Sequence, residues 1–84
     1  MSTFSFNPRW KEELVCSGGG GRFIIEFYMG KPSACLPSEQ AWHNKAPEWA
    51  RDLWPVLRDE LEAWCVENKA GFAIDERALV FFDP

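Results

Sequence analysis

The sequence predicts a small α+β protein in which an antiparallel sheet of three to five strands packs against a kinked amphipathic helix. Three observations predict this class. A β-branched and aromatic segment follows a run of four glycines, apolar residues recur at helical spacing over residues 46–68, and 84 residues suffice for one small core. We therefore expect a single domain over residues 1–84, with the element order β-β-(β)-α-α-β.

The first expected element is a β-hairpin around the glycines at 18–21. Residues 9–16 and 22–29 flank this run, and two strands joined by a glycine loop are typical of an antiparallel hairpin. A phosphate-binding loop would need a helix after the glycines, whereas Arg22 and a strand follow. The alternation of the second strand places on one face Phe23, Ile25, Phe27 and Met29.

Prolines limit the structure at residues 31–37, where we expect a short edge strand or an extended crossing. Ser38 is expected to be the N-cap of a short helix that ends near Asn44. Pro47 suits the first position of the next helix, and its ring disfavours helical angles at Ala46. A break between the two helices is therefore expected.

The region 46–68 is predicted to be one amphipathic helix, kinked at Pro55 because proline removes a backbone hydrogen bond. Gly71 is expected to end it. Residues 72–74 and 78–82 are expected to form a tight hairpin or one strand with a bulge. The apolar stripe of this helix consists of Ala50, Leu53, Trp54, Leu57, Leu61, Trp64 and Cys65.

The net charge of −4 is concentrated in residues 48–84, which carry four Lys/Arg and nine Asp/Glu. An acidic surface disfavours nucleic acid as a ligand and favours a basic protein partner. Four acidic residues at steps of four, seven and three are expected to line one side of the helix and bind that partner. The alternative is that this charged face is only exposed to solvent and binds nothing. They are Glu48, Asp52, Asp59 and Glu62, with Glu60 and Glu67 flanking the stripe.

Two tryptophans, Trp42 and Trp49, lie near the junction of the two expected helices. Tryptophan is enriched among the residues that dominate binding energy at protein interfaces. We expect both indoles to act as partner-binding anchors beside the acidic face. The alternative is that they cover the open end of the sheet.

The cysteines Cys16, Cys35 and Cys65 are odd in number and widely spaced. The N-terminus resembles no secretory signal, and no stretch approaches the ~20 apolar residues of a membrane span, so we expect a cytoplasmic protein with free thiols and no membrane contact. Metal ligands in close pairs are missing, so neither a metal nor a cofactor is expected. The best candidates for chemistry are Cys35 as nucleophile and His43 as base, but we expect binding and not catalysis.

A short acidic α+β chain, rich in tryptophan and with Trp49 beside an acidic helix, resembles the small immunity proteins of bacterial toxin–immunity systems. The resemblance implies a cytosolic inhibitor that binds a cognate toxin domain and blocks its active site or target surface. Two alternatives stay open. One is a small-ligand-binding or enzyme accessory domain that uses Cys35, His43 and Glu39, and the other is a homo-oligomeric structural module whose aromatic residues form a homodimer interface.

Overall fold

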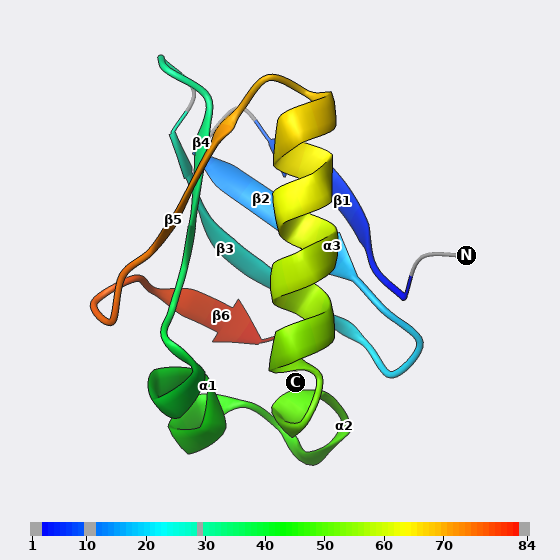
Figure 1. Cartoon of the computed structure of the whole chain (residues 1–84). Coiled ribbons are helices and arrows are strands. Elements are labelled where there is room, and N and C mark those ends of the chain that lie inside the picture. The colour runs from blue at the N-terminus through cyan, green and yellow to red at the C-terminus, as the bar shows by residue number, and fades with distance from the viewer. Residues whose placement is uncertain (1–2, 10–11, 29, 83–84) are drawn as a thin grey trace.

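The computed structural model describes residues 3–9, 12–28 and 30–82 of the chain (Figure 1). Within these ranges one six-stranded sheet forms a layer, and the long helix α3 (Trp54–Glu67) lies across one of its faces. The shorter helices α1 (Glu39–Lys45) and α2 (Glu48–Arg51) lie at one end of the layer, which confirms the α+β class. The strands are β1 (Ser5–Arg9), β2 (Glu13–Ser17), β3 (Arg22–Tyr28), β4 (Ser33–Leu36), β5 (Gly71–Ile74) and β6 (Val80–Phe82).

Strand β3 is at the centre of the sheet and pairs with three other strands. One of its edges carries β2 and then β1, both antiparallel. The other edge is divided, because β6 pairs with residues 23–25 and β4 with residues 26–28. Strand β5 runs parallel to β4. The described residues therefore form a mixed sheet of six strands and not the expected antiparallel sheet of three to five, since the chain passes through three helices between β4 and β5 and returns in the same direction.

The expected hairpin around the glycine run is confirmed. Strands β2 and β3 flank residues 18–21, and the N–H of Gly18 donates to the carbonyl of Gly21 at 2.8 Å. The segment 9–16, however, is not one strand. Strand β1 ends at Arg9 and β2 begins at Glu13, after Glu12 has taken a left-handed conformation with φ of 60°.

Two expectations for the other strands are wrong. Strand β4 is not an edge strand, because its four residues pair with β3 on one side and β5 on the other. Strands β5 and β6 form neither a hairpin nor one bulged strand, because they pair with different strands. A turn between them is closed by a 2.9 Å hydrogen bond from the N–H of Ala78 to the carbonyl of Asp75, and it sends the chain towards β3.

The helical region is broken and not kinked. Helix α2 ends at Arg51, two residues follow with ψ near 6° and 3°, and α3 begins at Trp54. Pro55 therefore lies in the first turn of α3, where a missing N–H breaks no intrahelical bond. The expected features of α1 are confirmed, because the Ser38 hydroxyl accepts from the N–H of Ala41 and the chain is extended at Ala46.

Helix α3 ends at Glu67, and the left-handed residue that follows it is Lys69 and not Gly71, which is already the first residue of β5. Lys69 has a left-handed φ of 57°. The N–H of Ala70 donates to the carbonyl of Cys65 at 2.7 Å, and that of Lys69 donates to the carbonyl of Val66 at 3.3 Å. This is the Schellman arrangement, with lysine at the position that glycine usually occupies.

The core lies between the sheet and the helices. The predicted inward face of β3 is confirmed, since Phe23, Ile25 and Phe27 are buried, whereas Met29 lies outside the described residues. The predicted helical stripe is also confirmed, with Leu53 and Trp64 half-buried and the other five residues buried. The remaining buried core residues include Phe4, Leu14, Cys16, Ala34, Leu36 and Trp42.

Candidate protein-binding site

The four predicted acidic residues are all exposed, but they do not line one helix. Glu48 lies on α2, Asp52 lies in the turn that follows, and only Asp59 and Glu62 share α3. The break before α3 ends the helical periodicity that would have aligned them, so the expected single acidic line is wrong. The acidic residues form one group on α3 and another at the α2 turn.

The solvent side of α3 combines acidic and apolar residues. Asp59, Glu62 and Val66 follow each other at steps of three and four, which places them on one side of the helix. Val66 is 75% exposed and Val56 is 37% exposed. We call the residues Val56, Asp59, Glu62 and Val66 the α3 ridge. Its two valines were missed in the sequence analysis, although both lie off the apolar stripe and were identifiable from that position.

Arg58 modifies the charge of the ridge. Its guanidinium donates to Oδ1 of Asp59 from Nη2 at 2.9 Å and from Nε at 3.1 Å. The same guanidinium carbon lies 5.6 Å from the ring centroid of Trp54, within cation–π range. The positive charge of Arg58 thus lies beside the carboxylate of Asp59, so the ridge is less negative than its own carboxylates imply.

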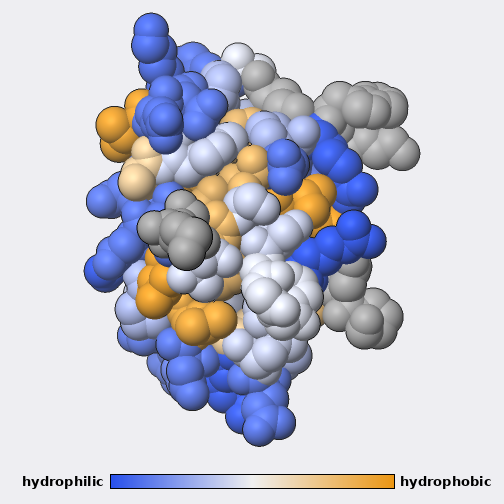
Figure 2. Space-filling view, turned by 90° about the vertical axis from the view of Figure 1, so that its right-hand side faces the viewer, coloured by the Kyte–Doolittle hydropathy of each residue, from blue (hydrophilic) through white to orange (hydrophobic). Residues whose placement is uncertain are grey.

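A groove of about 410 Å³ separates α3 from β1, beside the ridge. Figure 2 faces this side of the molecule, and apolar residues reach the surface there between hydrophilic ones. The rings of Phe6 and Trp64 lie 5.9 Å apart and form part of the groove wall. Glu60, Ala63 and Glu67 line the same groove from α3, so it has an apolar wall and acidic edges.

Glu60 has a structural role within this groove. Its two carboxylate oxygens accept hydrogen bonds from the N–H of Thr3 at 2.9 Å and of Phe4 at 2.8 Å. Partial burial works against ionisation, but these donors outweigh it and lower the pKa of the Glu60 carboxyl. Glu60 therefore ties the segment before β1 to α3.

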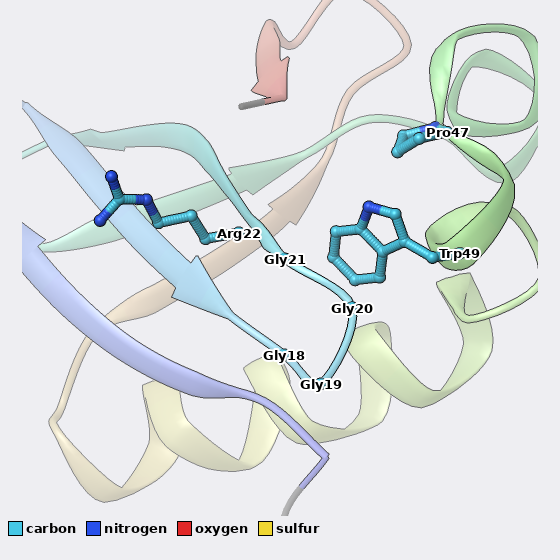
Figure 3. Close-up of a pocket in the computed structure, with 7 residues that line it drawn as sticks. All are labelled: Gly18, Gly19, Gly20, Gly21, Arg22, Pro47 and Trp49. Atoms are coloured by element: carbon cyan, nitrogen blue, oxygen red, sulfur yellow. The ribbon is translucent and has the colours of Figure 1, made fainter. Parts of the chain in front are cut away.

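Trp49 is half-buried and packs against the glycine loop (Figure 3). Its indole extends from α2 towards the loop and Pro47, whereas the side chain of Arg22 extends away from it (Figure 3). A Cβ atom on Gly20 would lie 2.8 Å from Cγ and Cδ2 of Trp49. An open groove of about 770 Å³ lies between loop and helix, so part of this indole remains exposed.

Trp42 is fully buried, and the expectation that it anchors a partner is wrong. Its Nε1 donates to the carbonyl of Ala50 at 2.9 Å, which satisfies the only polar atom of the indole. Its ring lies 5.1 Å from the rings of both Phe23 and Phe82. Trp42 therefore joins α1 to the sheet, whereas the otherwise similar Trp49 lies at the surface.

The residues considered for chemistry lie on different elements. Cys35 is on β4, and Glu39 and His43 are exposed on α1. Burial first, and then the charges of Glu26 and Asp75, raise the pKa of the Cys35 thiol. A nucleophilic thiol needs the opposite shift. Burial also raises the pKa of the Cys65 thiol and, far more strongly, that of Cys16.

Among the described residues, no group of three or more His, Cys, Asp or Glu is arranged so that it could hold a metal ion. Over the same ranges, no helix combines the length and apolarity needed to cross a membrane. The sequence matches no protein-family model, and neither a curated protein nor a solved structure matches it.

Proposed function

We propose that this chain is a cytoplasmic protein-binding inhibitor, of the immunity-protein class, that binds a basic partner through the α3 ridge. The observation that carries the proposal is the exposure of Val66, at 75%, between carboxylates of the same helix. Exposed apolar residues surrounded by charged ones are typical of an interface in which an apolar centre provides affinity and a charged rim provides orientation.

The groove beside the ridge extends the proposed contact surface. Ala63 and Glu67 line the groove and neighbour Val66 and Glu62 on α3. A partner side chain with an aliphatic stem and a basic end, such as lysine or arginine, fits an apolar wall with acidic edges. Trp49 and the acidic group Glu48 and Asp52 offer a second, smaller contact at the α2 turn.

The test requires the partner, so the tagged 84-residue chain is first used as bait in a lysate of its source cells at low salt. The captured protein is purified, and its dissociation constant is measured by calorimetry at low and high salt. The parent chain is compared with Asp59→Asn/Glu62→Gln and with Val66→Ser. The control is Glu39→Gln/Glu76→Gln, which removes the same charge at two exposed positions outside α3.

We expect the double variant on α3 to bind at least about tenfold more weakly, since losing one buried interfacial charge costs about 2–5 kcal/mol. Val66→Ser is expected to weaken binding through lost apolar contact, and the control to bind nearly as tightly as the parent. High salt should weaken the parent complex. Equal affinity of the parent and both α3 variants for the captured protein would contradict the proposal.

A further inference from the structure

The face of the sheet opposite α3, which we call the open face, has an apolar centre. Val15 pairs with Ile24 across β2 and β3, and Ile24 pairs with Phe81 across β3 and β6. Their chain neighbours Leu14, Phe23 and Ile25 point into the core and are buried, so these three residues point the other way. Phe81 is 58% exposed, and Tyr28, further along β3 on the same face, is 47% exposed.

This pattern differs from that of an ordinary solvated sheet face. An antiparallel sheet with one face in water normally alternates apolar residues inward with polar residues outward. Here the outward positions at the middle of β2, β3 and β6 are Val, Ile and Phe. A contiguous apolar row on an exposed face is typical of a surface that another molecule covers.

The charges around this row indicate what the covering molecule is. Arg9 and Glu13 pair across β1 and β2, with Nη2 and Oε1 3.0 Å apart, on the open face. Arg22 and Glu26 point to the same face from β3, by the alternation of that strand. These four are the charged residues that the described strands place on this face, and their charges sum to zero, whereas the chain carries −4. Two copies of a surface whose charges sum to zero can approach each other without net electrostatic repulsion. Two copies of an acidic surface, such as the α3 ridge, repel each other.

We propose that two copies of this chain pack their open faces together, sheet on sheet, as a two-fold homodimer with Phe81 and Ile24 at its centre. Sheets that pack face to face lie about 10 Å apart with interdigitated side chains. In this arrangement each α3 ridge lies on the outer side, away from the dimer interface. The dimer is therefore independent of the partner-binding proposal, and either can hold without the other.

The size of the face sets the expected strength. About five strands, spaced ~4.8 Å apart and each about five residues long at ~3.3 Å per residue, give a flat area on the order of 400 Å². This is below the roughly 800 Å² per partner of a standard stable interface. We therefore expect a weak dimer.

The test is sedimentation equilibrium of the full chain from about 1 μM to about 1 mM. The parent is compared with Phe81→Thr and Ile24→Thr, in which threonine retains a preference for strands but removes apolar area. The control is Val66→Thr, which makes a comparable change on the exposed side of α3. Circular dichroism establishes that each variant is folded, and Ile24→Thr decides the test if Phe81→Thr does not fold.

The expected result is a parent chain that passes from monomer to dimer over this range, with a dissociation constant raised at least about tenfold by either open-face variant and unchanged by Val66→Thr. A parent that remains monomeric at 1 mM overturns the proposal. So does a dimer that tolerates the open-face substitutions, or one that is disrupted by Val66→Thr.

Discussion

The indole of Trp49 lies so close to Gly20 that no Cβ atom fits between them: one placed on Gly20 would be 2.8 Å from Cγ and 2.9 Å from Cβ of Trp49. The blocking atoms include the part of the side chain that is fixed to the backbone of α2, so rotation of the ring cannot relieve the contact. Trp49 also lies 6.3 Å from the ring of Phe23, at the start of β3. The glycine loop thus packs directly against α2 through Trp49.

Gly20→Ala should destabilise the protein by about 1–3 kcal/mol, because the added methyl group overpacks a contact that cannot rearrange. The matched control is Gly19→Ala, since a Cβ atom there meets nothing within 4 Å. That control should be neutral or stabilising by up to about 1 kcal/mol through a less flexible unfolded chain. Urea unfolding of both variants measures the difference, and equal midpoints would show that the loop does not pack on Trp49 as described.

Lys69→Gly should stabilise the protein by about 0.5–1 kcal/mol. Lys69 has φ of 57°, a conformation that costs an L-residue about 1–2 kcal/mol and glycine far less, although glycine also gives the unfolded chain more freedom. Lys69→Ala keeps the strained conformation and serves as the control. Thermal and urea unfolding should rank glycine above lysine and alanine, and a lower stability for the glycine variant would exclude the left-handed helix end.

Features set by local spacing could be predicted from the sequence. Leu57 and Leu61 are buried as their four-residue step predicts, and the alternation of Phe23 and Ile25 with Ile24 gives the two faces of β3 correctly. The N-cap at Ser38 was equally predictable, because its hydroxyl accepts a hydrogen bond from an N–H only three residues away. Each of these features depends on interactions within one element or its ends.

Features set by distant contacts could not be predicted in this way. The pairing of Phe82 with Phe23, and of Ile74 with Leu36, joins residues far apart in the chain, and no local pattern identifies such partners. Trp42 and Trp49 look alike in the sequence. Their different burial depends on what each indole meets in the fold: the Ala50 carbonyl and two phenylalanine rings for Trp42, and an open glycine loop for Trp49.

Glu60→Gln should destabilise the protein by about 1 kcal/mol at pH 7, because the N–H groups of Thr3 and Phe4 lose a charged acceptor. The folded-state pKa of Glu60 is lowered from an ordinary value of 4.5. Its ionised form therefore contributes stability above that value, and the contribution is lost as the pH falls through the folded-state pKa. The difference between parent and variant should shrink on acidification.

The measurement is urea unfolding of the parent and Glu60→Gln at pH 7 and at about pH 3. The control is Glu62→Gln, on the same helix but exposed, which should change stability by less than about 0.5 kcal/mol at either pH. A difference for Glu60→Gln that grows on acidification would contradict the hydrogen bonds to the segment before β1.

Alkylation of the folded protein should be slow at all three cysteines, and slowest at Cys16. Burial raises the pKa of all three thiols, and Glu26 and Asp75 add to the effect at Cys35, so little reactive thiolate is present near neutral pH. Treatment with iodoacetamide at pH 7.5, followed by peptide mass spectrometry, measures each site separately. Glu26→Gln should accelerate the reaction at Cys35 and leave Cys16 unchanged, because Glu26 pairs with Cys35 across β3 and β4, whereas Cys16 is buried in the core. Alkylation of Cys35 faster than that of free cysteine would contradict the raised pKa and favour the alternative in which Cys35 and His43 serve a small-molecule site.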